Sequence, residues 1–262
     1  MTKIQVAINA AVAAGKLLEN HYGMVKEVKS KESLRDVVSN VDKIAEETAI
    51  SIIKDNFKDS TIISEEGDQS LQNSKEIWVV DALDGTVNYI HQFPYYCVSI
   101  SYWVNDKPKL GVVYNPNSSE LFYAEKHLGA FLNQKRLKIR DCAINEGLTA
   151  MAFSGKAYNP DERYKEFDIF GKVNDLSRGC LRTGSAALNL CYLADGRFSL
   201  VIGKANKMWD IGAGLIIAEE AAANVNFRIV DKENFLIDYL AAVPASKRLI
   251  ESKLDLSFIK YN

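Results

Sequence analysis

The sequence predicts a layered α/β protein with a sheet in each half of the chain and helices packed on both sheets. Two observations predict this class. Short apolar segments separated by turn residues crowd residues 61–133, which is typical of strands, and after Asp141 strand-like segments alternate with helical ones. The 262 residues, 47% hydrophobic and 25% charged, have an ordinary globular composition and are enough for one large domain or two closely packed halves.

The N-terminal segment, residues 1–23, is the first expected helix. Its apolar residues recur at helical spacing and polar residues such as Lys16 and Glu19 lie between them, which favours an amphipathic helix over a signal peptide. The expected apolar face consists of Ile4, Ala7, Ile8, Ala11, Val12, Ala14 and Leu18. No apolar run approaches membrane-spanning length, so we expect a cytoplasmic protein.

A second helix is expected from about Asp42 to Asn56, and six strands follow it. Turn residues at 105–106, 115–117 and 127–129 separate several of these strands, which indicates an antiparallel meander. The expected strands are TIIS, IWVVD, YYCVSISYWV, KLGVVYN, ELFYAE and GAFLN.

In the second half of the chain, strands and helices are expected to alternate. The strands are LTAMAFSG and RFSLVIG, and the helices are SAALNLCYLADG, DIGAGLIIAEEAAAN and one near PASKRLIESKL. The composition does not shift enough at residue 141 to predict independently folding units. We therefore expect a single domain over residues 1–262, with an α+β half at about 1–140 that binds metal and phosphate and an α/β half at 141–262.

Charge and residue usage weigh against several classes of protein. The net charge of −2 argues against nucleic-acid binding, which needs a basic stripe. The four cysteines are irregularly spaced and form no Cys-x-x-Cys pair, so reduced core thiols are expected rather than disulfides or a zinc site. The three histidines show no metal-ligand spacing.

The segment IWVVDALDGTVNY carries the strongest functional signal. Residues three apart on a strand point to opposite faces, so the chain must turn between Asp81 and Asp84 if the two carboxylates converge. That turn frees the Leu83 carbonyl, and two carboxylates with a carbonyl form a hard-oxygen site suited to Mg²⁺ or Mn²⁺. Gly85 allows close backbone approach, and N–H groups at a helix start near Thr86 would accept a phosphate. These residues predict phosphoryl chemistry; the simpler alternative is an Asx turn.

A two-metal site needs more than two carboxylates, and three further segments supply them. Glu65 and Glu66 stand in TIISEEGD, where the alternative is a solvated acidic turn. Asp210 in KMWDIGAG has a helix cap as its alternative, and Asp42 in DVVSNVD has a capping box with Ser39. Together these segments form the pattern of a family.

DALDGTVNY, preceded by DVVSNVD and SEEGD and followed by LRTGSAALNLCYLADGRF and WDIGAGLIIAEEA, resembles the inositol monophosphatase family of Mg²⁺-dependent, often lithium-sensitive phosphatases. The resemblance covers nearly the whole chain. It implies a layered αβαβα sandwich, the inositol-monophosphatase-like sugar phosphatase fold. It also implies a small phosphorylated substrate, two to three Mg²⁺ ions per site with Mn²⁺ as an alternative, and a homodimer.

The resemblance also implies roles for individual residues. Thr86, paired with Asp42, would orient and deprotonate the water that attacks phosphorus, and Glu65 would act beside them. Glu65 would also serve a weaker third metal site, with Glu66 as its neighbour. The ligands of the first two ions would be Glu65, Asp81, the Leu83 carbonyl, Asp84 and Asp210. The substrate would contact the backbone N–H groups of Gly85 and Thr86 at its phosphate, and Gly184, Ser185 and Ala186 on its alcohol side.

Ala82 and Gly203 are two of the positions that depart from the family pattern. Ala82 stands where proline is common, a change that should be tolerated because proline only stiffens this turn. Gly203 falls where the animal inositol phosphatases carry a Glu that contacts inositol hydroxyls, so inositol selectivity is open. Lys204 and Lys207 nearby would suit a more acidic substrate, although two solvated lysines are the preferred interpretation.

Three competing hypotheses fit the sequence less well. A haloacid-dehalogenase-type phosphatase needs acids two residues apart, whereas Asp81 and Asp84 are three apart. A cysteine phosphatase would use Cys191-x5-Arg197, but Cys191 continues a helical pattern. A non-catalytic regulatory or binding protein on the same fold should have lost a metal ligand or the Thr–Asp pair, and neither is lost here.

We therefore expect a Mg²⁺-dependent phosphomonoesterase acting on a small polyol or sugar phosphate. Inositol monophosphate is the first candidate substrate. Fructose 1,6-bisphosphate and phosphoadenosine phosphate are the alternatives.

Overall fold

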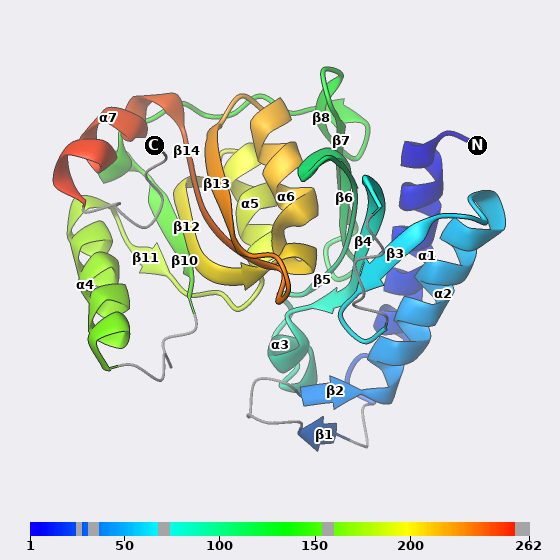
Figure 1. The fold of residues 1–262 in the computed structure, drawn as a ribbon. Helices are drawn as coiled ribbons and strands as arrows, with labels where there is room; N and C mark the ends of the chain where they lie inside the picture. Colours follow the sequence, from blue (N-terminus) through cyan, green and yellow to red (C-terminus); the bar gives the residue numbers. More distant parts are fainter. Residues whose placement is uncertain (25–27, 31–36, 68–73, 154–159, 255–262) are drawn as a thin grey trace.

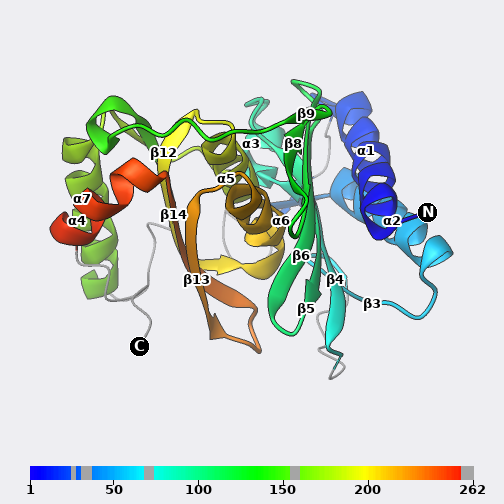
Figure 2. The same ribbon diagram turned by 90° about the horizontal axis from the view of Figure 1, so that it is seen from above.

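The computed structural model describes residues 1–24, 28–30, 37–67, 74–153 and 160–254 (Figure 1). Two sheets alternate with three layers of helices, as the view from above shows (Figure 2), so the predicted αβαβα sandwich is confirmed. The three helical layers are α1 (Lys3–His21) with α2 (Asn40–Asn56), α5 (Ala186–Ala194) with α6 (Met208–Glu220), and α4 (Pro160–Leu176) with α7 (Pro244–Lys253).

Helix α1 starts where the sequence pattern places it. The Thr2 hydroxyl accepts from the Gln5 N–H, and the Gln5 side chain accepts from the Thr2 N–H, so the two residues form a capping box. The buried stripe includes Val6 and Ala10, whereas the expected Ile4, Ile8 and Val12 are half-buried. Alanines dominate this stripe, which lets α1 lie close to α2 and to the sheet beneath it.

A seven-stranded sheet carries the first half of the chain, and one of its pairings differs from the expected meander. Strands β4 to β9 pair antiparallel in chain order, but β3 pairs parallel to β4. The physical consequence is that both strands end at the same edge of the sheet, so residues just after β3 lie beside residues at the end of β4. The strands are β3 (Thr61–Ser64), β4 (Glu76–Asp84), β5 (Cys97–Val104), β6 (Lys107–Asn115), β7 (Glu120–Glu125), β8 (Gly129–Leu132) and β9 (Lys135–Arg136).

A five-stranded mixed sheet carries the second half. Its order is β11-β10-β12-β14-β13, with β10 parallel to both of its neighbours and β14 antiparallel to both of its own. Helix α4, strand β11 and the hairpin of β13 and β14 were not predicted from the sequence. The strands are β10 (Leu148–Ala152), β11 (Cys180–Leu181), β12 (Phe198–Lys207), β13 (Asn224–Asp231) and β14 (Leu236–Ala242).

The remaining described elements are short. Helix α3 (Thr86–Ile90) links β4 to β5, β1 (Val28–Ser30) pairs antiparallel with β2 (Val37–Ser39), and a 3₁₀ turn covers Ile144–Glu146.

Helix α6 lies between the two sheets and is apolar on every side, because each side faces a sheet or α5. Ile211 and Leu215 belong to a core cluster with residues of both sheets, while Ala213 and Ile217 pack with residues of the seven-stranded sheet. The first turn of this helix carries Asp210, so both sheets together fix where that carboxylate lies. Within the described residues, no helix has the length and apolar character needed to cross a membrane.

Candidate active site

The end of β4 brings Asp81 and Asp84 to one face by a bulge. Asp81 pairs with Ser99 and Asp84 with Cys97, so three steps on β4 match two steps on β5. Ser99 and Cys97 lie on the same face of β5, and their partners therefore share a face of β4. The Asp81 carboxylate accepts the Leu83 N–H at 2.9 Å, which stabilises the bulge. The expected convergence thus arises within a continuing strand, not from a chain reversal.

Three carboxylates from three elements converge at this edge of the sheet. Glu65 follows β3, Asp81 lies near the end of β4, and Asp210 lies in the first turn of α6. One oxygen of each lies within 4.8 Å of the other two. A set of carboxylate oxygens at this spacing fits a hard divalent cation such as Mg²⁺ or Mn²⁺.

The electrostatics of the cluster also favour a bound cation. Burial raises the pKa of the Asp81 carboxyl well above its usual range, and the charges of Glu65, Asp84 and Asp210 raise it further. Burial likewise raises the pKa of Asp210, followed by the charges of Asp84 and Glu65. A positive ion bound between buried carboxylates offsets their mutual electrostatic repulsion.

Asp84 lies at the end of β4, and its carboxylate is held by residues at the start of α5. Its Oδ2 accepts from the Ser185 hydroxyl at 2.6 Å and from the Ala187 N–H at 2.8 Å. Burial raises the pKa of Asp84 to about 6, although these hydrogen bonds lower it. Ser185 was expected on the alcohol side of the substrate pocket; it lines the cavity, and its hydroxyl is directed to Asp84.

Gly85 and Thr86 form the junction between β4 and α3. Gly85 has a φ of 95°, and a Cβ there would lie 2.9 Å from the Tyr95 carbonyl oxygen. The Thr86 hydroxyl donates to the Leu83 carbonyl oxygen at 3.0 Å. Asp42 is buried at the start of α2, and its charge contributes to the raised pKa of Asp81, so it faces the same acidic group.

Glu46 positions the loop that carries Glu65, a role that sequence reasoning missed. One carboxylate oxygen of Glu46 accepts from the Ser64 hydroxyl at 2.8 Å, and the other accepts from the Glu66 N–H at 3.0 Å. The signal was present, because Glu46 follows Asp42 by one helical turn and so shares its face of α2.

A cavity of about 1270 Å³ extends from the acidic cluster to the five-stranded sheet. The residues predicted from the sequence include the acidic cluster at one end of this cavity and residues 184–186, but not most of the opposite wall. Part of that wall belongs to α4, which was not predicted. The missed residues include Phe153, Glu162, Glu166, Arg182 and Asn206.

Asn88 joins α3 to the predicted substrate loop. Its side-chain amide donates to the carbonyl oxygens of Tyr95 and Thr183, at 2.7 and 2.9 Å. Gly184 packs directly against this amide, because a Cβ at Gly184 would lie 2.8 Å from Asn88 Nδ2.

The two lysines near Gly203 are engaged with protein groups. The Lys204 ammonium pairs with Glu162 of α4. The Lys207 ammonium donates to the Asn234 carbonyl oxygen at 2.9 Å and lies over the Trp209 ring.

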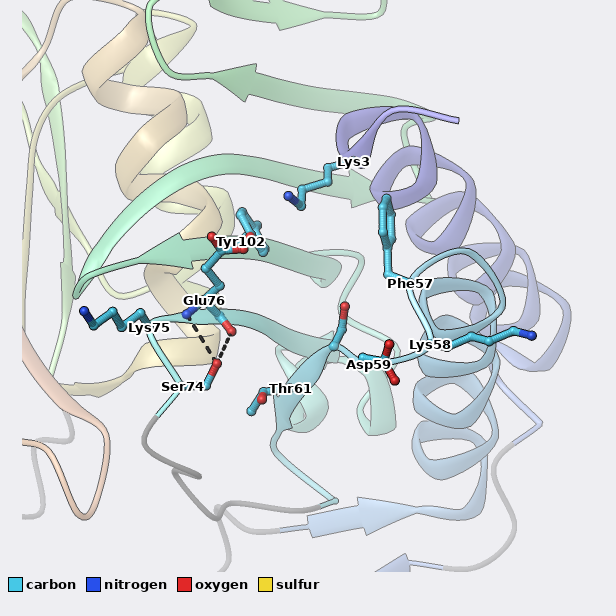
Figure 3. A pocket seen from close by; sticks show the side chains of 10 residues that line it. Lys3, Phe57, Lys58, Asp59, Thr61, Ser74, Lys75, Glu76 and Tyr102 are labelled. Carbon is cyan, nitrogen blue, oxygen red and sulfur yellow. Dashed lines mark hydrogen bonds between the residues drawn. The ribbon is translucent and has the colours of Figure 1, made fainter.

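A second, smaller cavity of about 510 Å³ lies at the opposite end of β4, near the start of α1 (Figure 3). Lys3 lies over the Tyr102 ring there, whereas Lys58 and Lys75 point away from the hollow. Among the described residues, the three carboxylates whose spacing fits a metal ion lie in the larger cavity. We therefore assign the candidate active site to the larger cavity.

The cysteine-phosphatase hypothesis is disfavoured by the position of Cys191. This residue lies inside α5 and is fully buried, and burial raises the pKa of its thiol well above the usual range. A nucleophilic cysteine requires a lowered thiol pKa.

Comparison with known proteins agrees with this geometry. A model of the inositol monophosphatase family matches residues 2–252. The chain belongs to the inositol monophosphatase family. The acidic cluster described above therefore lies in a member of a family named for a phosphatase.

Three relatives show how much sequence and structure this chain shares with known proteins. The chain is 33% identical to the fructose-1,6-bisphosphatase/inositol-1-monophosphatase of Thermotoga maritima, over 86% of this chain and 84% of that one. It is 36% identical to the Nus factor SuhB of Pasteurella multocida, over 85% and 84%. The structure of an inositol monophosphatase from Anabaena sp. PCC 7120 superposes with a TM-score of 0.80 at 31% identity and covers 97% of both chains.

Proposed function

We propose that this protein is a Mg²⁺-dependent phosphomonoesterase that hydrolyses a small polyol or sugar phosphate, with inositol monophosphate as the first candidate. The observation that carries the proposal is the convergence of Glu65, Asp81 and Asp210 at the end of a large cavity, in a chain of this family. Membership of the family supports the phosphatase activity, and the substrate is our inference.

Hydrogen bonds within the protein hold the acidic residues of this site in place before substrate binds. Mg²⁺ ions at the cluster would lower the pKa of a water and offset charge on the phosphoryl oxygens. Glu46 holds the loop of Glu65, and α5 holds Asp84, so the acids need little rearrangement on binding. In the proposed reaction, Thr86 and Asp42 orient the attacking water and accept its proton, and no covalent phosphoenzyme is formed.

The test is phosphate release from inositol monophosphate by the wild-type protein and by Asp81→Asn, with Asp106→Asn in an exposed hairpin turn as the matched control. We expect EDTA to abolish activity and Mg²⁺ to restore it. The Asp81→Asn change should lower kcat/KM at least about 100-fold, because it removes a carboxylate from the cluster. Unchanged turnover in EDTA would contradict the proposed mechanism.

A non-catalytic binding role is the second candidate, and the similarity to a protein named as a Nus factor supports it. It predicts that Mg²⁺ raises the thermal stability of the protein while a panel of phosphomonoesters is not hydrolysed. Measurable turnover of any panel member that requires Mg²⁺ would argue against it.

Bisphosphate substrates are weaker candidates. A second phosphate near β12 would need free cationic groups, and Lys204 and Lys207 are both engaged with protein groups. The homodimer, the lithium sensitivity and the cytoplasmic location expected from the sequence stay predictions.

A further inference from the structure

Ser99 of β5 lies between two of the elements that carry the acidic cluster. Its backbone pairs with Asp81 in the antiparallel ladder of β4 and β5, so the two side chains share a face of the sheet. Its hydroxyl donates at 3.0 Å to the carbonyl oxygen of Trp209, which lies in the first turn of α6 directly before Asp210. Ser99 therefore contacts both the strand of Asp81 and the helix of Asp210.

Helix α6 packs closely on this part of β5 (Figure 2). A Cβ at Gly212 would lie 2.6 Å from the Ser101 hydroxyl oxygen, so the start of the helix lies directly on the strand. Cys97, two residues before Ser99 and on the same face, has its Sγ 3.8 Å from Asp84 Oδ2. This face of β5 thus contacts the acidic end of β4 as well as the start of α6.

Two other hydrogen bonds hold the first turn of α6, but neither joins it to β4 or β5. Asp210 Oδ2 accepts from the Lys207 N–H at 3.3 Å, which orients the carboxylate within its own turn. The Met208 N–H donates to the Phe235 carbonyl oxygen at 2.9 Å, which ties the turn to the residue before β14 in the five-stranded sheet. The Ser99 hydroxyl ties the same turn to the seven-stranded sheet, where the other acids of the cluster lie.

The relative position of the acids decides how well they bind a divalent cation. Mg²⁺ requires near-octahedral geometry with oxygen ligands at about 2.0–2.1 Å, so a small displacement of Asp210 from Asp81 weakens binding without removing a ligand. Ser99 is fully buried and lies outside the lining of the cavity. Its hydroxyl acts through the Trp209 backbone and touches neither ion nor substrate.

We propose that Ser99 is a positioning residue that holds the start of α6, and with it Asp210, at the distance from Asp81 that Mg²⁺ requires. The inference rests on the metal dependence in the proposed function and adds a determinant of Mg²⁺ affinity outside the cavity. Loss of the hydroxyl keeps every acid but frees the first turn of α6 to shift on the sheet. Such a variant binds Mg²⁺ more weakly and regains the wild-type rate when Mg²⁺ is raised.

The test is calorimetric titration of the full-length proteins with Mg²⁺ after metal is removed with EDTA. We expect Ser99→Ala to lower the Mg²⁺ affinity about 10-fold. Ser99→Cys keeps a side chain of similar size with a weak donor, so its loss of affinity should be smaller.

Ser199→Ala is the matched control. Ser199 is also a fully buried serine on a strand, and its hydroxyl donates to the Leu148 carbonyl oxygen at 3.2 Å within the five-stranded sheet. Because this bond holds no part of the acidic cluster, Ser199→Ala should change the Mg²⁺ affinity less than about twofold. Melting curves in EDTA check that the variants fold, and Ser99→Cys carries the test if Ser99→Ala does not fold.

Steady-state kinetics separate positioning from a direct part in the reaction. With inositol 1-phosphate as substrate, Ser99→Ala should raise the Mg²⁺ concentration for half-maximal activity about 10-fold. Its kcat at saturating Mg²⁺ should stay within about twofold of the wild-type value, because all acids are kept.

The outcomes separate the two proposals. Equal loss of Mg²⁺ affinity in Ser99→Ala and Ser199→Ala, or no loss in Ser99→Ala, overturns the inference and leaves the phosphatase proposal standing. A lower kcat at saturating Mg²⁺ with unchanged affinity also overturns the inference alone. A wild-type protein that binds Mg²⁺ but hydrolyses no phosphomonoester overturns the phosphatase proposal alone, and one that binds no Mg²⁺ overturns both.

Discussion

Gly85 sets the distance between the acids of β4 and the backbone that follows them. Its left-handed φ of 95° lets the chain pass from the strand into α3 in one residue, and its hydrogen faces the Tyr95 carbonyl oxygen. The Asp84 carboxylate and the Thr86 N–H are therefore neighbours by backbone geometry alone.

Gly85→Ala should destabilise the protein by about 2 kcal/mol or more, because a residue with a Cβ is strained in this conformation and meets a backbone oxygen. The control is Gly171→Ala in α4, where a Cβ meets open space and should stabilise by up to about 1 kcal/mol. Urea denaturation of the two variants checks the prediction, and equal effects in the same direction would contradict it.

At the level of single residues, the sequence predicted much of the acidic cluster and little of the opposite wall of the cavity. Asp81 and Asp210 follow apolar segments and stand out by position. The hydrogen bond from the Ser185 hydroxyl to Asp84 could not be predicted, because the two residues are 101 positions apart in the chain. The position of Asn206 in the cavity wall could not be predicted either, because it depends on a bulge in β12 that strand periodicity does not show.

Elements of the two halves are joined by a polar network around Glu120 of β7. The Glu120 carboxylate accepts from Arg197, which precedes β12, and from the Tyr192 hydroxyl of α5 at 3.1 Å. The Arg197 guanidinium also lies 4.1 Å from the centroid of the Tyr192 ring. Burial alone would raise the pKa of Glu120, but hydrogen bonds from Arg197, Ser118 and Tyr192 hold it below its usual range.

Glu120→Gln should lower the free energy of unfolding at pH 7 by about 1–3 kcal/mol, because it leaves Arg197 without its charged partner. The folded-state pKa of Glu120 is lowered, so its contribution is complete above the ordinary glutamate pKa of about 4.3 and is lost as pH falls through the folded value. The difference between wild type and variant should therefore shrink below about pH 4. Urea titrations at several pH values measure this difference in the free energy of unfolding. Glu125→Gln, at the other end of β7, is the control. A difference that does not depend on pH would count against the network.

Helix α4 was not predicted from the sequence because its apolar signal is weak. In α4 the buried residues are Val173 and the polar Glu166, so helical periodicity is hidden. Strand β13 differs, because its alternation of Val225, Phe227 and Ile229 is a strand pattern. The parallel pairing of β3 with β4 was not readable, because strand direction depends on the path of the connecting segment.

The whole molecule is held together by α6, which belongs to the second half of the chain and covers the sheet of the first. Ala213 and Ile217 pack with Val113 and Phe122 of the seven-stranded sheet. The acidic cluster crosses the same boundary, since Asp210 comes from α6 and Glu65 and Asp81 from the first half. This arrangement supports the single-domain organisation that we propose for residues 1–262.

A fragment of residues 1–140 should not unfold cooperatively, because the face of its sheet that α5 and α6 cover would be exposed. We expect it to bind a hydrophobic dye, and addition of a 141–262 fragment to restore a cooperative transition. A full-length chain cut at an inserted protease site after residue 140 is the control. A sharp unfolding transition of the first fragment alone would show two independent domains.

The bulges in β4 and β12 have a consequence for how this protein can evolve. One bulge aligns Asp81 with Asp84, the other aligns Gly203 with Asn206, and the two bulges lie in different sheets. Substitutions near Asn206 would therefore reshape that wall of the cavity while Asp81 and Asp84 keep their positions. If the proposed function holds, divergence of substrate preference would be recorded in the strands of the five-stranded sheet that line the cavity, and conservation of the chemistry in β4 and α6.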